Sequence, residues 1–150
     1  MLIRNADQWK IELNAKDNDT RTPFHLACSE GHLEVAQLLM RIPEIDLDAK
    51  DFCGHNTAFH FACMRGRLEI VKMFIRNAAN PRINMNAKSK SGSTAFHWAC
   101  FYGHADIAEY MIENSSKMNM ELNSKTNGGS TAFHWACYYG HTKVAALLLR

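Results

Sequence analysis

A histidine and a cysteine stand three residues apart at four places in the chain. Residues at this spacing lie on the same face of a helix, about one turn apart. Each pair could therefore supply two metal ligands, or place a base beside a nucleophilic thiol. The four His–Cys pairs are His25 and Cys28, His60 and Cys63, His97 and Cys100, and His134 and Cys137.

The expected spacing between the pairs does not suit either chemistry. Zinc takes four ligands at about 2.0–2.3 Å, so two pairs would have to share one ion. Packed helices lie about 8–10 Å apart, which keeps equivalent donors on neighbouring helices from converging. A cysteine nucleophile needs exposure and a lowered pKa, whereas each of these cysteines lies in an apolar segment, as a small buried hydrophobe does. We therefore predict no metal ion, no cofactor and no catalytic residue.

The pairs belong to a longer motif that occurs four times. The copies are TPFHLACSEGH from Thr22, TAFHFACMRGR from Thr57, TAFHWACFYGH from Thr94 and TAFHWACYYGH from Thr131, offset by 35, 37 and 37 residues. A period of this length is typical of a solenoid of stacked units. Threonine favours the start of a helix and glycine its end, so each copy predicts a short inner helix.

A second amphipathic run follows each motif. The runs are LEVAQLLMR from Leu33, LEIVKMFIRN from Leu68, ADIAEYMIEN from Ala105 and TKVAALLLR from Thr142. Their apolar residues recur three and four apart, which predicts an outer helix. A polar segment with turn residues comes next, such as NMNAKSKSGS at residues 84–93. The predicted unit is a helix, a tight turn, a second helix and a protruding turn.

This unit resembles the ankyrin repeat, whose pattern is a turn with glycine, then TPLHLAA, two variable residues, GH and an EIV-type outer helix. TPFHLAC and SEGHLEVAQLL stand in those places here. The resemblance implies an all-α ankyrin-repeat solenoid of stacked helix-turn-helix units with protruding β-hairpin-like turns. It also implies that His25, His60, His97 and His134 bond the backbone of a neighbouring turn. Arg67 departs from the pattern, because it stands where GH has its histidine, and the turn around His55 and Asn56 is one residue longer.

The resemblance covers essentially the whole chain, so we expect a single array over residues 1–150. Its parts are a partial leading repeat at 1–16 and repeats at 17–50, 51–87, 88–124 and 125–150, the last one truncated. LIRNADQWKIELNAKD at the start matches FIRNAANPRINMNAKS from Phe74, which predicts that residues 2–6 are the tail of an outer helix. Repeat arrays need polar caps, and neither end has one, so we expect a segment of a longer array.

The composition is that of an ordinary globular chain, with 47% hydrophobic residues, 21% charged residues and a net charge of +2. No apolar run approaches the ~20 residues that cross a bilayer, and the start lacks the apolar region of a secretory signal. Five cysteines, four in one context, do not resemble a disulfide framework. We expect reduced thiols, a cytoplasmic location (with the nucleus as an alternative) and no membrane insertion.

The positions that differ between the copies indicate where binding resides. The two residues before each motif glycine change from Ser29 and Glu30 to Tyr138 and Tyr139, so aromatic rings accumulate toward the last repeat. Aromatic residues, Met and Arg are enriched in interface hot spots. A row of turn lysines would add positive charge along one edge. The candidate partner-binding residues are Trp98, Phe101, Tyr102, Trp135, Tyr138, Tyr139, Met64, Arg65, Glu30, Lys88 and Lys125.

Two interpretations of these rings stay open: they form a binding surface, or they pack as core, above all Trp98 and Trp135. The interpretation that we favour is a non-catalytic module that binds a protein or peptide on a concave aromatic face. Its alternatives are a structural spacer without its own ligand and a targeting domain of a larger enzyme. Nucleic acid is disfavoured, because acidic residues such as Asp17, Asp19 and Asp51 accompany the lysines. We expect no small-molecule substrate.

Overall fold

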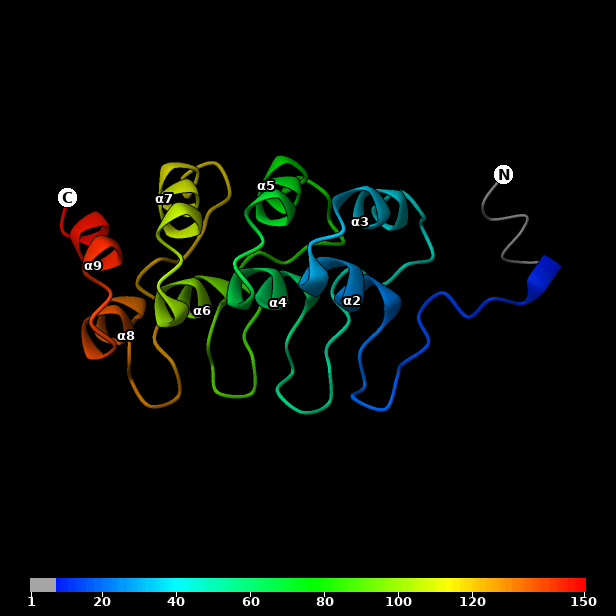
Figure 1. Ribbon diagram of the computed structural model, residues 1–150, viewed down its shortest axis with the longest axis horizontal. Coiled ribbons are helices and arrows are strands. Elements are labelled where there is room, and N and C mark those ends of the chain that lie inside the picture. The colour runs from blue at the N-terminus through cyan, green and yellow to red at the C-terminus, as the bar shows by residue number, and fades with distance from the viewer. Residues whose placement is uncertain (1–7) are drawn as a thin grey trace.

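The computed structural model describes residues 8–150, so the predicted helix tail at residues 2–6 lies outside the described residues. Figure 1 shows two rows of helices, with turns protruding beyond one row. The inner row consists of α2 (Pro23–Glu30), α4 (Ala58–Met64), α6 (Ala95–Tyr102) and α8 (Ala132–Tyr138). The outer row consists of α3 (Leu33–Met40), α5 (Leu68–Arg76), α7 (Ala105–Glu113) and α9 (Thr142–Leu148). No strand occurs within residues 8–150. The predicted all-α repeat solenoid is confirmed.

Each inner helix begins at the motif threonine through a reciprocal cap. In α2 the hydroxyl of Thr22 accepts a hydrogen bond from the backbone N–H of His25. The His25 ring returns one, because its Nδ1 accepts from the backbone N–H of Thr22 at 3.1 Å. The same pair of bonds opens α4, α6 and α8. Two of the orphan donors at each helix start are therefore satisfied within the motif itself.

The motif glycine lets the chain turn between the two helices of a repeat. Gly31 follows α2 with a φ of 79° and Gly103 follows α6 with a φ of 73°. This left-handed conformation is strained for residues with a Cβ, which is why glycine ends these helices. The chain then reverses within two residues, so α3 packs directly against α2 and α7 against α6.

The core lies between the two rows and runs along the stack. Phe74 of the outer helix α5 contacts two inner helices, with ring centroids 5.8 Å from Phe24 and 5.0 Å from Phe59. All three rings are buried. Burying one such side chain is worth roughly 1.5–3 kcal/mol, so each repeat is stabilised mainly by the neighbours that cover it.

The protruding turns close without forming strands. The backbone N–H of Ser89 donates to the carbonyl of Ser93 at 2.8 Å, four residues on. In the second repeat Asp51 donates to Asn56, five residues on, so the predicted extra residue is confirmed. Adjacent turns are joined by a backbone bond from Lys90 to Gly54 at 2.8 Å. The turns thus form a continuous edge beside the inner helices.

Arg82 fixes the long connection between α5 and the third repeat. Its guanidinium donates to the carbonyls of Met40 at 2.8 Å, Ile45 at 3.0 Å and Ile42 at 3.1 Å. These carbonyls lie at and just after the end of α3, where helix acceptors have no partner within the helix. A single side chain therefore ties the second repeat to the first. The repeated motif does not predict this contact, because Arg82 lies outside the segment from the motif threonine to the motif glycine.

In residues 8–150, no helix combines the length and apolar character that a bilayer crossing requires.

Candidate partner-binding surface

The motif histidines are used to join one repeat to the next. Nε2 of His25 lies 3.1 Å from the carbonyl oxygen of Asn56, and Nε2 of His60 lies 3.1 Å from that of Ser93. His97 makes the equivalent contact with Ser130 at 3.3 Å. Because Nδ1 accepts from the threonine N–H, Nε2 carries the proton and donates. The role that the ankyrin resemblance implies is confirmed for these three histidines.

Burial keeps these imidazoles neutral. It lowers the pKa of His25 and His97, and it lowers the pKa of His60 to about 4. Their two nitrogens are already hydrogen-bonded to protein groups, which leaves neither free to act as a base. At the last repeat His134 keeps its cap, but within the described residues its Nε2 has no acceptor.

Three cysteines of the His–Cys pairs are buried and the fourth is not. Burial raises the pKa of the Cys28 and Cys63 thiols and raises that of Cys100 to about 12, the opposite of an activated thiol. Cys137 is exposed, so the expectation of a buried cysteine is wrong there. The physical reason is that, within residues 8–150, no further inner helix follows α8 to cover that side.

Over residues 8–150 the structure brings together no group of three His, Cys, Asp or Glu side chains that could hold a metal ion. The expected absence of metal and cofactor stays a prediction.

A second link runs beside the inter-helix turns. His104 Nε2 lies 3.0 Å from the carbonyl oxygen of Met64, and His141 Nε2 lies 2.7 Å from that of Phe101. Arg67, which replaces the expected histidine, donates from Nε to the carbonyl of Ser29 at 2.9 Å. The substitution therefore preserves the contact. His104 and His141 of the GH pairs thus join neighbouring repeats, whereas His32 is exposed.

Six of the predicted site residues form one aromatic cluster on α6 and α8. Its members are Trp98, Phe101, Tyr102, Trp135, Tyr138 and Tyr139. Three contacts cross between the repeats: Trp98 to Trp135 at 5.8 Å, Phe101 to Trp135 at 4.8 Å and Phe101 to Tyr139 at 4.4 Å between ring centroids. Most of the ring pairs are tilted or edge-on, the favoured geometry for aromatic packing.

The cluster has a buried base and an exposed rim. Trp98 packs against the hydrophobic core and is half-buried, as are Phe101 and Trp135. Tyr102 is 48% exposed, Tyr139 47% and Tyr138 82%. Each tryptophan therefore fits both interpretations that the sequence left open. Part of its ring packs against neighbouring side chains, and the rest is at the surface. The three tyrosines therefore form the solvent-exposed rim of the cluster.

A cavity of about 390 Å³ opens beside the cluster at the end of the stack. It is lined by Ser130, His134, Trp135, Tyr138 and Tyr139. The unpaired Nε2 of His134 belongs to a residue of this cavity. The sequence predicted a structural role for His134 and did not predict the cavity. The cavity lies at the last described repeat, where no following repeat covers α8.

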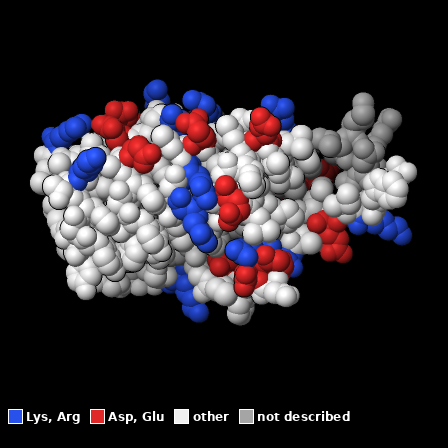
Figure 2. Space-filling model, in the orientation of Figure 1, with Lys and Arg blue, Asp and Glu red and all other residues white. Residues whose placement is uncertain are grey.

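The surrounding surface of the cluster carries little charge. No Asp, Glu, Lys or Arg occurs between Lys90 and Asp106, or between Lys125 and Lys143. Figure 2 shows this uncharged area over α6 and α8, whereas charges gather along the outer helices and over the first two repeats. The cluster is therefore a neutral, aromatic patch within a charged molecule.

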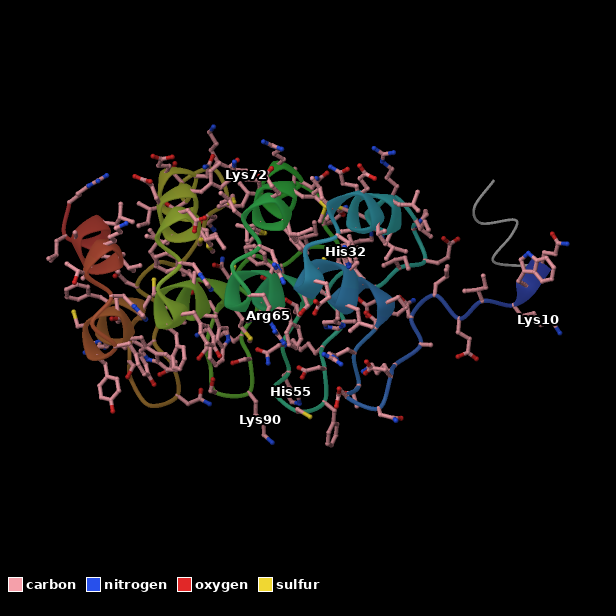
Figure 3. The ribbon with its side chains drawn as sticks, viewed as in Figure 1. Lys10, His32, His55, Arg65, Lys72 and Lys90 are labelled. Carbon is pink, nitrogen blue, oxygen red and sulfur yellow. The ribbon has the colours of Figure 1, made fainter. Side chains whose placement is uncertain are left out.

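The remaining predicted residues lie along the same edge but outside the cluster. Glu30 and Arg65 are exposed at the ends of α2 and α4, and Met64 is half-buried. Figure 3 shows Arg65 on the inner row, with Lys90 on the turns and Lys72 on the outer row. Ser29 is buried, so in the first repeat only the second of the two variable positions before the glycine lies at the surface. Arg67 bonds the carbonyl of Ser29 and covers it.

The turn lysines form a row, and two of them donate hydrogen bonds to the backbone of the next turn. Nζ of Lys16 donates to the carbonyl of Lys50 at 3.2 Å, and Nζ of Lys50 donates to that of Lys88 at 3.2 Å. Lys88 and Lys125 are exposed. The row thus places positive charge along the protruding turns.

Comparison with known proteins agrees with the architecture. A family model for ankyrin repeats (3 copies) matches residues 1–87 and 81–150. An ankyrin repeat-containing protein of Schizosaccharomyces pombe is 48% identical over 42 residues. That segment is 28% of this chain and 18% of the yeast protein, so it supports the repeat and not a shared overall function.

Proposed function

Because this chain belongs to the ankyrin-repeat family, we propose that it is a non-catalytic module that binds a protein or peptide on its aromatic cluster. Ankyrin repeats are generally protein-interaction modules and are typically not catalytic. The observation that carries the proposal is the exposure of Tyr102, Tyr138 and Tyr139 above half-buried rings in an uncharged area. Solitary exposed apolar residues are common, but a contiguous patch marks an interaction site.

The geometry suits a partner with apolar side chains and free backbone groups. Tyrosine offers a flat apolar ring together with a hydroxyl that both donates and accepts, at low entropic cost. The half-buried Trp98, Phe101 and Trp135 hold these rings in place from below. Lys88 and Lys125 at the turns, with Arg65 and Glu30 farther along the edge, would act at the rim, where charge affects the association rate more than the lifetime of a complex.

The test is selection of peptides from a displayed library on the wild-type protein, followed by titration against a Tyr102→Ala/Tyr139→Ala double variant. Truncating a hot-spot aromatic costs about 2 kcal/mol or more, which is about thirtyfold in affinity for each ring. We expect the selected peptides to lose binding to the double variant. Trp9→Ala is the matched control, because Trp9 is a highly exposed aromatic residue next to Lys10, which Figure 3 shows at the end of the array opposite α8.

A thermal melt of the double variant decides between the outcomes. Retained melting with lost binding supports the proposal. Melting that collapses together with binding would make the tyrosines part of the packing between repeats. Equal binding by the wild type and the double variant would reject the aromatic cluster as the site.

A structural spacer is the second candidate. It is favoured by the contacts of Phe101 with Trp135 and Tyr139, which join two repeats and would stiffen the stack without any ligand. Under this alternative, selection recovers no peptide whose binding depends on the cluster.

A further inference from the structure

The outer row of helices carries two neighbouring cavities. One of about 200 Å³ lies between the C-terminal ends of α3 and α5, and one of about 400 Å³ lies between those of α5 and α7. Arg76 lines both cavities. Figure 1 shows α3, α5 and α7 side by side in this row. Because each cavity lies between two described repeats, its opening does not depend on either end of the chain. We call the two cavities the outer groove.

The rim of the outer groove is positively charged. Arg41 follows α3, Arg76 ends α5 and Lys117 follows α7, and all three are exposed. In the part of the chain that the structure describes, no Asp or Glu lines either cavity. Within residues 8–150 none of the three cations takes part in a salt bridge. Their charge is therefore not neutralised by a described acidic group.

The two arginines of the rim are not the caps of their helices. A cation near the end of a helix often interacts with the last carbonyl groups, which would explain both arginines without a ligand. Other side chains already bond these carbonyls. In α3 the guanidinium of Arg82 donates to the carbonyl of Met40 at 2.8 Å, and in α5 Nδ2 of Asn77 donates to that of Met73 at 2.7 Å. The rim arginines therefore remain available to an anion.

Two asparagines add hydrogen-bond acceptors to the groove. Asn114 holds the position of Asn77 one repeat later, and its Nδ2 donates to the carbonyl of Tyr110 at 2.8 Å. In both residues the amide nitrogen is thus turned to the helix, which leaves the amide oxygen as an acceptor. Within residues 8–150, Oδ1 of neither asparagine accepts a hydrogen bond. Both oxygens are available to an N–H group of a ligand.

The larger cavity has an apolar floor. Its apolar lining consists largely of Ile75, Ala78, Tyr110 and Met118. Tyr110 packs against the core, and Nζ of Lys72 lies 5.7 Å from the centroid of its ring. Figure 3 shows Lys72 on α5 in the outer row. The cavity therefore suits an apolar side chain that lies next to cationic groups.

The spacing of the repeats indicates the conformation of a ligand. Packed helices lie about 8–10 Å apart, so the two arginines recur along the groove at about this distance. A polyproline II segment repeats its side-chain direction every three residues, which is about 9 Å at a rise of about 3.1 Å per residue. It makes no internal hydrogen bonds, so its N–H groups can donate to a partner. We propose that the outer groove binds an acidic segment of a partner protein in the polyproline II conformation, with a carboxylate at every third residue.

Each part of the groove has a role in this complex. The first carboxylate pairs with Arg41, the second with Arg76 and the third with Lys117. Guanidinium groups suit this task, because their donors match the two oxygens of a carboxylate. An apolar side chain between the second and third carboxylates enters the cavity of about 400 Å³. The amide oxygens of Asn77 and Asn114 accept from the backbone of the segment.

The next cavity along the outer row limits the length of the acidic segment. It is lined by Glu109 and Glu113, with Arg150 as its cation. Glu113 holds the position that Arg76 has one repeat earlier. An acidic ligand is therefore favoured over the first two cavities and repelled at the third. The outer groove is also separate from the aromatic cluster, which lies on the inner helices α6 and α8.

Fluorescence anisotropy with a labelled peptide tests the proposal. The peptide has Glu at every third position, one Leu between the second and third Glu, and Pro elsewhere to hold the polyproline II conformation. We expect it to bind the wild type with a Kd between about 10 µM and about 1 mM, because each exposed ion pair contributes little. The same peptide with Gln in place of Glu is expected not to bind in this range.

Two variants remove different parts of the groove. Arg76→Glu reverses the charge that both cavities share, and we expect it to weaken binding at least about tenfold. Ala79→Trp keeps every charge and fills the larger cavity from an exposed position, so we expect a loss of about tenfold as well. Lys90→Glu is the matched control, because it makes the same change of net charge on the protruding turns, which Figure 3 shows away from Lys72. We expect its binding to stay within about twofold of the wild type.

Four results would each overturn the proposal: no binding of the Glu peptide below about 1 mM, equal binding of the Gln peptide, unchanged binding by Arg76→Glu or Ala79→Trp, and equal losses in Arg76→Glu and Lys90→Glu. A single-stranded oligonucleotide of the same net charge that competes as strongly as the peptide would also overturn it, since the groove would then attract any polyanion. Thermal melts check that the variants fold.

The aromatic cluster provides the last comparison. Tyr102→Ala/Tyr139→Ala is expected to bind the acidic peptide as the wild type does, and Arg76→Glu is expected to keep the peptide selected on the cluster. The failure of this inference is thereby distinguishable from that of the proposed function.

Discussion

The third and fourth repeats carry nearly the same motif in different surroundings. Residues 94–104 and 131–141 differ at one position, Phe101 against Tyr138. Both form an inner helix with the same threonine cap. In the third repeat the phenylalanine, histidine and cysteine of the motif are buried, and in the fourth the same three residues are exposed. The motif therefore determines local structure, whereas burial depends on whether a following repeat covers it.

The largest expected difference between the two repeats is the cost of removing the motif phenylalanine. Phe96→Ala leaves a cavity in a packed core and is expected to lower the free energy of unfolding by about 3–5 kcal/mol. Phe133→Ala removes a ring that is already partly in water, so we expect a loss of under about 1 kcal/mol. Urea denaturation followed by circular dichroism measures both. Equal losses would mean that the end repeat is covered in solution.

Acid is expected to destabilise the stack through its buried motif histidines. The pKa of His60 is lowered from 6.5 to about 4 in the folded state, so the unfolded state binds more protons between these values. Its stabilising contribution is fully present above pH 6.5 and is lost as the pH falls toward 4, by roughly 3 kcal/mol. His25 and His97 act in the same direction.

Denaturation at a series of pH values between 7 and 4 measures this loss. His134→Ala serves as the comparison variant, because the exposed ring of His134 lacks the contact with a following turn that His60 makes. If the stability of this variant no longer depended on pH, the acid sensitivity would come from the end of the stack and not from the buried histidines.

Thiol reactivity compares the two motif cysteines directly. Cys137 is exposed, whereas burial raises the pKa of Cys100 to about 12. In native protein we expect Cys137 and the exposed Cys53 to react with a chromogenic disulfide at once, and the three buried cysteines to react only on unfolding. A Cys137→Ser variant should lose one rapid equivalent. Rapid reaction of all five thiols would show that the stack opens readily.

The repeated residues were predictable because each performs the same local task in every copy. Threonine caps, left-handed glycines and the helical period of the apolar residues follow from the sequence of one unit. The histidine links were predictable only from the family resemblance, since no spacing within a repeat indicates an acceptor in the next one. Arg82 could not be found in this way, because it occurs once and acts on carbonyls of another repeat.

The candidate site was only partly predictable for a related reason. The sequence grouped the rings of α6 and α8 correctly, and their contacts across the repeats confirm that they lie together. It could not predict that Ser29 is buried or that Cys137 is exposed. Both depend on what lies beside the repeat and not on the repeat itself. Partner binding by the cluster stays a proposal.

The smallest expected effect concerns the one residue that differs between the two motifs. Tyr138 is 82% exposed, so Tyr138→Phe is expected to change the free energy of unfolding by less than about 0.5 kcal/mol. Phe101 is half-buried against Trp135 and Tyr139, so Phe101→Tyr brings a hydroxyl into a packed cluster and is expected to cost about 1 kcal/mol. The first variant makes the fourth motif identical to the third, and the second does the reverse. Chemical denaturation of both variants under the same conditions measures the difference. If the two substitutions change the free energy of unfolding by the same amount, packing at this position would depend on residue identity and not on the neighbouring repeat.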